Sequence, residues 1–140
     1  MAEVNFSFVD TWNAAPFFQW ARGRLTEVRH GYARGVLQVQ SQHRGGGGTH
    51  AINGGIMAYL FDGLISAAAR SVAREGYKAM STLSLNIQYL QLLEAESEVW
   101  GEAEVIKAGK STAFVEARLF NDEGEVCSTC SGIVRLFYER

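Results

Sequence analysis

The chain has 140 residues, a formal net charge of −2 and 47% hydrophobic residues. These values are typical of a globular protein, so we expect a single domain over residues 1–140. The slightly negative charge argues against nucleic-acid binding, which needs a basic surface. No apolar stretch reaches the roughly 18 residues of a membrane span, and the first residues have no basic or apolar signal region. We therefore expect a cytoplasmic protein without membrane contact.

The first half of the sequence predicts a short helix followed by two strands. Residues 9–22 predict the helix, and residues 24–29 and 32–42 predict strands joined by a turn at His30–Gly31. Four consecutive glycines follow at 45–48, and their backbone entropy opposes any regular element. Residues 43–55 are therefore predicted to be a flexible loop.

A long helix is predicted over residues 54–75, with Asn53 as its N-cap. The segment is apolar almost all the way round through Ala69, and polar residues return only at Arg70. A helix with this pattern is buried on most of its sides. It therefore requires a sheet that curves around it.

Four antiparallel strands are predicted after this helix. Turns at Gly109–Lys110 and at residues 121–124 separate the last three of them. In the first of the four, Leu83 and Leu85 alternate with Thr82 and Ser84, which predicts one apolar and one polar face. The fold class is therefore α+β, with a curved antiparallel sheet wrapped around one long central helix and a short N-terminal helix.

The two cysteines, Cys127 and Cys130, form a C-x-x-C motif that occurs in redox and zinc sites. Their surroundings alternate as a strand does, and an odd separation places the two side chains on opposite faces. A second pair of ligands is absent from the sequence. We interpret both as strand residues that fill the core, and we expect no metal site.

Gly54 and Gly55 at the predicted start of the long helix suggest a site for negative charge. The first N–H groups of a helix lack backbone partners and carry partial positive charge. Glycines let a ligand approach the backbone closely. Both residues are therefore candidate donors to an oxyanion.

Asp62 is the only charged residue between Arg44 and Arg70. A carboxylate on a buried apolar helix is costly unless something stabilises it, and such groups often belong to functional sites. The structural alternative is an aspartate bonded to Ser66 or to a partner chain. Gly55 and Asp62 are seven residues apart, which is about 10 Å along a helix axis.

That separation is too long for both groups of one chain to act on a single carbonyl carbon. If both act, one chain supplies the donor and another supplies the carboxylate. The spacing therefore predicts a site across the interface of a symmetric homodimer or homotetramer.

The stretch "HAINGGIMAYLFDG" resembles the PaaI-like, phenylacetate-degradation group of hotdog-fold thioesterases. That group has a His-Gly-Gly triplet and an aspartate nine residues after the histidine. Here Asn53 and the two glycines occupy the triplet, and Asp62 occupies the position of the aspartate. Thr82 and Asn86 match the group's Ser/Thr and Asn on a later strand. The run "KAGKSTAFVEARLF" is similar to its turn and following strand.

The resemblance implies a hotdog fold and hydrolysis of an acyl-CoA thioester to a free acid and CoA. Asp62 would act as general base or nucleophile, the Gly55 N–H would polarise the carbonyl, and Thr82 would orient the water or Asp62. It also implies contacts to CoA from four residues of a later turn: Lys107, Gly109, Lys110 and Ser111. No separate cofactor is expected, because coenzyme A is part of the substrate.

Two departures from the family pattern lie before the helix. Asn53 replaces the family histidine, and it would either donate to the thioester carbonyl or cap the helix. Gly47 stands where the family often has asparagine, whereas His50 lies three residues before Asn53. Two alternatives stay open: a hotdog hydratase or dehydratase that uses His50 with Asp62, and an acyl-CoA-binding module without catalysis.

Overall fold

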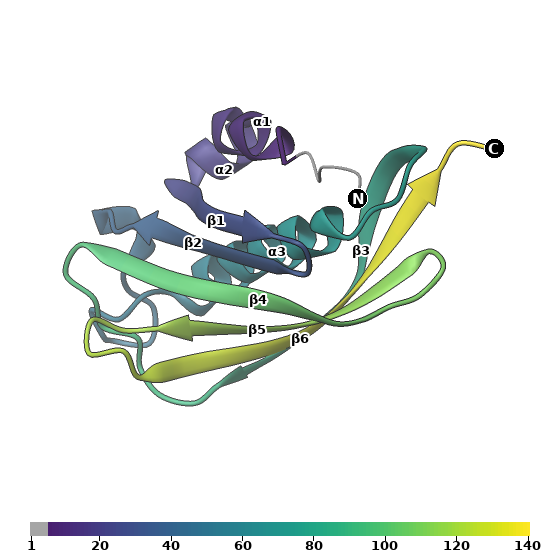
Figure 1. Cartoon of the computed structure of the whole chain (residues 1–140). Helices are drawn as coiled ribbons and strands as arrows, with labels where there is room; N and C mark the ends of the chain where they lie inside the picture. The colour runs from purple at the N-terminus through teal and green to yellow at the C-terminus, as the bar shows by residue number, and fades with distance from the viewer. Residues whose placement is uncertain (1–5) are drawn as a thin grey trace.

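The computed structural model describes residues 6–140, and part of the segment on which the prediction of no secretory signal rests lies outside them. A six-stranded antiparallel sheet curves around a long helix, α3 (Gly54–Ser71), which confirms the predicted α+β fold (Figure 1). The strands are β1 (Gly23–Arg29), β2 (Tyr32–Gln38), β3 (Tyr77–Tyr89), β4 (Glu98–Ala108), β5 (Thr112–Phe120) and β6 (Val126–Tyr138). Their order in the sheet is β1-β2-β4-β5-β6-β3, so β1 and β3 are the edge strands.

Two glycines on the inner face of the sheet bring α3 close to it. Gly35 on β2 pairs with Gly101 on β4, and both lie beneath Leu64 of α3. A Cβ atom at either position would lie 2.9 Å from a methyl group of Leu64, closer than such atoms pack. The missing side chains therefore make room for the core of the helix, in which Leu64 and Ile65 have no exposed surface.

The single N-terminal helix predicted over residues 9–22 is wrong, because the segment forms two helices. These are α1 (Phe8–Ala14) and α2 (Pro16–Trp20). Ala15 between them is extended, with φ −68° and ψ 135°, because a residue before proline avoids the helical region. Both helices pack on β1 (Figure 1).

Side chains fix α1 and α2 in place. Asn13 donates to the Leu25 carbonyl at 3.1 Å and accepts from the Leu25 N–H at 2.7 Å. The Tyr59 hydroxyl of α3 donates to the Phe17 carbonyl at 2.7 Å. The N-terminal helices are therefore bonded both to the sheet and to the central helix.

Other predicted boundaries move by a few residues. β2 ends at Gln38 rather than at residue 42, because a short 3-10 helix, η1 (Ser41–His43), follows it. Helix α3 ends at Ser71, four residues before the predicted end.

Cys127 and Cys130 are buried free thiols in β6, as predicted for strand residues. Within residues 6–140, no helix is both long and apolar enough to cross a membrane.

A bulge at Leu83 interrupts the alternation of β3. Thr82 pairs with Val134 and Ser84 pairs with Ile133, so Leu83 is the extra residue. Thr82 consequently points to the inner face, as its buried pair partner Val134 does. The predicted strict alternation, which put Thr82 and Asn86 on one face, is therefore wrong at this point.

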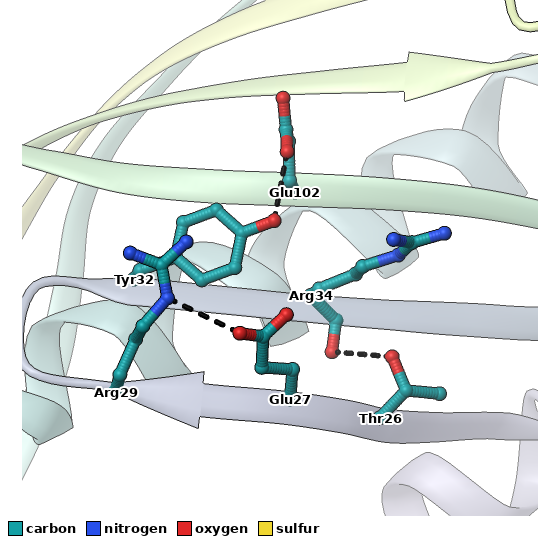
Figure 2. A network of polar contacts seen from close by, with 6 residues as sticks. All are labelled: Thr26, Glu27, Arg29, Tyr32, Arg34 and Glu102. Atoms are coloured by element: carbon teal, nitrogen blue, oxygen red, sulfur yellow. Dashed lines mark hydrogen bonds and ion pairs between the residues drawn. The ribbon is translucent and has the colours of Figure 1, made fainter.

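The outer face of the sheet is polar around β1, β2 and β4 (Figure 2). The Tyr32 hydroxyl donates to Glu102 at 2.8 Å, and Arg29 forms an ion pair with Glu27 at 3.2 Å. Burial and the hydrogen bond to Glu102 raise the pKa of Tyr32 to about 12. Arg34 lies over the ring of Trp100 at 4.4 Å.

Candidate functional site

Asp62 lies near the middle of α3 on a flank that the sheet does not cover. Its side chain is exposed in the single chain, so the prediction that it is buried is wrong for one protomer. Ser66 and Arg70 follow at helical spacing on the same flank. An apolar pattern does not distinguish a helix side covered by the chain's own sheet from one that a neighbour covers.

The Thr82 hydroxyl donates to Asp62 Oδ1 at 2.7 Å, so β3 fixes the orientation of the carboxylate. Ser66 Oγ lies 3.5 Å from Thr82 Oγ1. A hydroxyl has one hydrogen, and that of Thr82 points to Asp62. Ser66 is therefore the donor to Thr82, and the second oxygen of Asp62 has no partner in residues 6–140. A carboxylate oriented in this way can accept a proton from a water molecule.

A pocket of about 330 Å³ opens beside this pair. Its walls come from α1, α2, α3 and the first half of β3. Asp62, Ser66 and Thr82 supply its polar groups; the other lining residues are Trp12, Phe17, Gly63, Tyr77 and Met80. A polar reacting end and a largely apolar body are typical of pockets for small molecules.

The start of α3 shows which backbone N–H groups are available. Asn53 caps the helix as predicted: its Oδ1 accepts from the Gly55 N–H at 2.8 Å, and its Nδ2 donates to the Gly45 carbonyl at 3.2 Å. The N–H groups of Gly54 and Ile56 have no hydrogen-bond partner among the described residues. The free donors at the helix start are therefore Gly54 and Ile56, whereas the N–H of Gly55 is occupied by the cap.

Tyr89, at the end of β3, contacts the same helix start. Its hydroxyl donates to the Gly54 carbonyl at 2.7 Å. A Cβ atom at Gly54 would lie 3.3 Å from the tyrosine ring. Sequence reasoning missed this residue, because nothing in the pattern of β3 shows which of its side chains reaches the helix.

A second pocket, of about 660 Å³, lies at this helix start and includes Asn53, Gly54 and Tyr89. The glycine loop forms part of its wall, and residues 45–48 all have positive φ. This backbone explains the four glycines, because other residues rarely adopt it. Of the residues that the structure describes, none lines both this pocket and the pocket of Asp62. The two predicted halves of the site therefore lie apart in one chain.

The other predicted site residues lie elsewhere. His50 is exposed near Arg44 and Asp122 and does not line the Asp62 pocket, so the pair that a hydratase would use is not formed within one chain. Asn86 pairs with the exposed Ser131 on the outer face, opposite to Thr82.

The turn between β4 and β5 packs near the end of α3. Arg74 donates to the Lys110 carbonyl, and the Leu136 N–H donates to the Ser111 carbonyl at 2.7 Å. Gly109 closes the turn by donating to Thr112, while the side chains of Lys107 and Lys110 are exposed. Arg74 is 12 residues after Asp62 and three residues beyond the end of α3.

His43 supports the helix start from beneath. It is 2% exposed, its Nδ1 accepts from the Gln40 N–H at 3.0 Å, and its carbonyl accepts from the Asn53 N–H at 2.8 Å. Burial, with a smaller contribution from Arg22, lowers the pKa of His43 below its usual 6.5. The native state therefore requires a neutral ring whose Nδ1 can accept.

We expect the free energy of unfolding to fall as the pH drops below about 6.5. In that range the unfolded chain protonates His43, whereas the native chain does so only at a lower pH. The contribution is complete above the unfolded pKa. Denaturant unfolding at several pH values measures how the free energy of unfolding changes with pH. This pH dependence should be smaller for His43→Asn than for the wild type. His30→Asn, at an exposed turn, should keep the pH dependence of the wild type. If the free energy of unfolding of His43→Asn kept the pH dependence of the wild type, His43 would not be the group responsible.

Comparison with known proteins places this geometry in a family. Residues 50–128, more than half of the chain, match the family model described as "Thioesterase superfamily". No curated protein is significantly similar in sequence.

Solved structures with the same fold share between 17% and 19% identity with the chain in the three examples that follow. A thioesterase family protein from Silicibacter pomeroyi has a TM-score of 0.82 at 19% identity and covers 93% of this chain and 95% of its own. The E. coli PaaI protein from the phenylacetic acid degradation operon has a TM-score of 0.75 at 18% identity, with coverage of 92% and 93%.

A hypothetical thioesterase with coenzyme A from Streptococcus pneumoniae has a TM-score of 0.78 at 17% identity, with coverage of 94% and 98%. These similarities confirm the hotdog fold that the sequence predicted, and the family-model match extends from just before α3 into β6. The chain belongs to the thioesterase superfamily.

Proposed function

We propose that the protein hydrolyses an acyl-CoA thioester to a free acid and CoA in a site shared by two protomers. The observation that carries this proposal is the Asp62–Thr82 pair at 2.7 Å, which faces a pocket and leaves one carboxylate oxygen free. Asp62 takes a proton from the attacking water or attacks the thioester itself. In both cases Thr82 keeps the carboxylate oriented, and Ser66 orients Thr82.

The free N–H groups at the start of α3 provide the donors to the thioester carbonyl. Negative charge develops on that oxygen during attack, and helix N-termini stabilise it. We assign this role to Gly54 rather than to Gly55, because the Gly55 N–H is bonded to Asn53. Asn53 acts as the cap that holds the helix start.

The partner that completes the site is a second copy of the chain, paired along β3. This strand is 13 residues long, and within residues 6–140 its only neighbour in the sheet is β6. Leu83 and Tyr89 on it, and Leu90 and Leu92 just after it, are exposed large hydrophobic residues. A long, apolar, unpaired edge favours association with another strand. The other edge strand, β1, is short and bulged, and α1 and α2 pack on it.

Antiparallel pairing of two β3 strands brings the two half-sites together. Thr82 is bonded to Asp62, and Tyr89 is bonded to Gly54. A two-fold axis near Leu85, midway between Thr82 and Tyr89, places the Asp62 pocket of one protomer beside the helix start of the other. Gly54 and Asp62 of one chain are eight residues apart, about 12 Å along the helix, and the pairing removes this separation by combining groups of two chains.

The turn with Lys107, Gly109, Lys110 and Ser111 is proposed to contact the CoA portion. Its two exposed lysines supply positive charge for phosphates. The similarity to the CoA-containing Streptococcus pneumoniae structure supports a CoA ester as substrate.

A set of acyl-CoA esters of different chain length and aromatic character tests this function. We expect release of free thiol well above the rate without protein, measured with a thiol reagent. Tight binding of CoA esters without thiol release would instead establish a binding module. Hydration of an enoyl-CoA without thiol release would establish a hydratase.

A further inference from the structure

We propose that the acyl group taken by this site ends in a carboxylate, which Arg70 binds with the indole N–H of Trp12 as a second donor; this inference rests on the proposed thioesterase function. The site would then select dicarboxylic monothioesters over neutral acyl groups of equal length. The evidence comes from two donors without an acceptor, one beside the Asp62 pocket and one in a residue of its wall.

Arg70 is the first of these donors. It lies eight residues after Asp62 on the same flank of α3, which corresponds to about 12 Å along the axis. Its guanidinium lies 4.0 Å from the ring centre of Tyr77 and 5.1 Å from that of Phe8. In residues 6–140 it has neither a hydrogen bond nor an ion pair. A planar guanidinium held between rings is suited to bind a carboxylate through two parallel bonds.

The Tyr77 ring connects Arg70 to the pocket. It lines the pocket that contains Asp62, and it lies beneath the guanidinium. Arg70 does not itself line the pocket, but its contact with Tyr77 places the guanidinium beside the pocket wall, about two helical turns from Asp62. Arg74 lies beyond the end of α3 and donates to the Lys110 carbonyl, so the positive charge on this side of the pocket comes from Arg70. The local charge here attracts an anion.

Trp12 supplies the second donor. Its Nε1 is the one buried side-chain nitrogen or oxygen without a hydrogen-bond partner among the described residues. Buried polar groups are nearly always bonded, so an orphan donor requires an explanation. Trp12 lines the same pocket, and the Phe8 ring contacts both Trp12 and Arg70. An oxygen at this end of the pocket would satisfy the indole N–H.

The wall between the two ends suits an alkyl chain. Phe17 and Met80 line the pocket and offer only apolar side chains. A neutral acyl chain would fit that wall but would leave both donors without an acceptor. A chain of about six to ten carbons spans the rise from Asp62 to Arg70.

The experiment compares octanoyl-CoA with octanedioyl-CoA, which differ only in the terminal carboxylate. We expect the wild type to have a higher kcat/KM for octanedioyl-CoA. Arg70→Gln should lower kcat/KM for octanedioyl-CoA by about tenfold or more, mainly by raising KM, because a charged hydrogen bond to the substrate is lost. The same variant should change kcat/KM for octanoyl-CoA by less than about twofold. Trp12→Phe, which keeps the ring stacking but removes the N–H, should reduce the preference in the same direction.

Arg34→Gln is the matched control, because Arg34 also lies over an aromatic ring, that of Trp100. Arg34 is on the outer face of the sheet (Figure 2). This variant should leave both values unchanged. A wild-type preference for octanoyl-CoA, or an equal loss for both esters in Arg70→Gln, would overturn the inference and leave the thioesterase function intact. Absence of thiol release from both esters and from the wider set would overturn the proposed function itself.

Discussion

Asp62→Asn is expected to lower kcat for the best acyl-CoA ester by about 100- to 10,000-fold, the contribution of a positioned acid–base group. Asparagine has nearly the same shape and keeps an oxygen for the Thr82 hydroxyl, so the pocket should retain its geometry. The amide can neither accept the proton of the water nor attack the thioester. KM and the thermal unfolding midpoint should therefore change little. Thiol-release kinetics measure kcat and KM, and thermal unfolding measures the midpoint.

Asp10→Asn is the control for this prediction. Asp10 is an exposed carboxylate on α1, so its loss changes the net charge by the same amount without touching the pocket. Its activity should equal that of the wild type. Normal turnover in Asp62→Asn would remove Asp62 from the mechanism, and a large drop in thermal stability would assign it a structural role instead.

Two inactive variants should restore activity when mixed, because each site takes one group from each protomer. The second variant is Gly54→Pro, which removes the proposed donor to the carbonyl. Proline is tolerated at the first position of a helix, and the extended Asn53 before it is compatible with proline. After subunit exchange with Asp62→Asn, half of the dimers are mixed and each has one intact site. We expect about one quarter of the wild-type activity.

The double variant Asp62→Asn/Gly54→Pro provides the control for this mixture. Mixed with Asp62→Asn, it offers no intact site in any dimer, so no activity should return. Size-exclusion chromatography would confirm that all variants keep the same oligomeric state. If the two single variants stay inactive after verified exchange, the site lies within one chain and the shared-site proposal fails.

The fold could be predicted from the sequence because its strongest signals are local. The long apolar run fixes α3, and period-two alternation with turn residues fixes most strands. Pro16 already contained the signal that splits the N-terminal helix, since the residue before proline avoids the helical region. The bulge at Leu83 had no such local signal, because it depends on the pairing of β3 with β6.

The candidate site could be predicted only in part. Asp62 stood out as a lone charge in an apolar segment, and Asn53 as the cap before two glycines. The exposure of Asp62 could not be predicted, because apolar residues on a helix do not specify what covers them. The contact of Tyr89 with Gly54, and the capture of the Gly55 N–H by Asn53, depend on tertiary placement of single atoms.

The paired glycines beneath Leu64, Gly35 and Gly101, restrict which substitutions this protein can tolerate away from its site. Asp62 and the amide donors are all carried by α3. The distance between this helix and the sheet depends on two residues that have no side chains. An added methyl group at Gly35 or Gly101 would lie 2.9 Å from a Leu64 methyl group and no farther from a carbonyl oxygen of a neighbouring strand. The helix or the strands would have to shift, while every reacting group stays chemically intact. Loss of activity can thus originate at positions that contribute no atom to the chemistry.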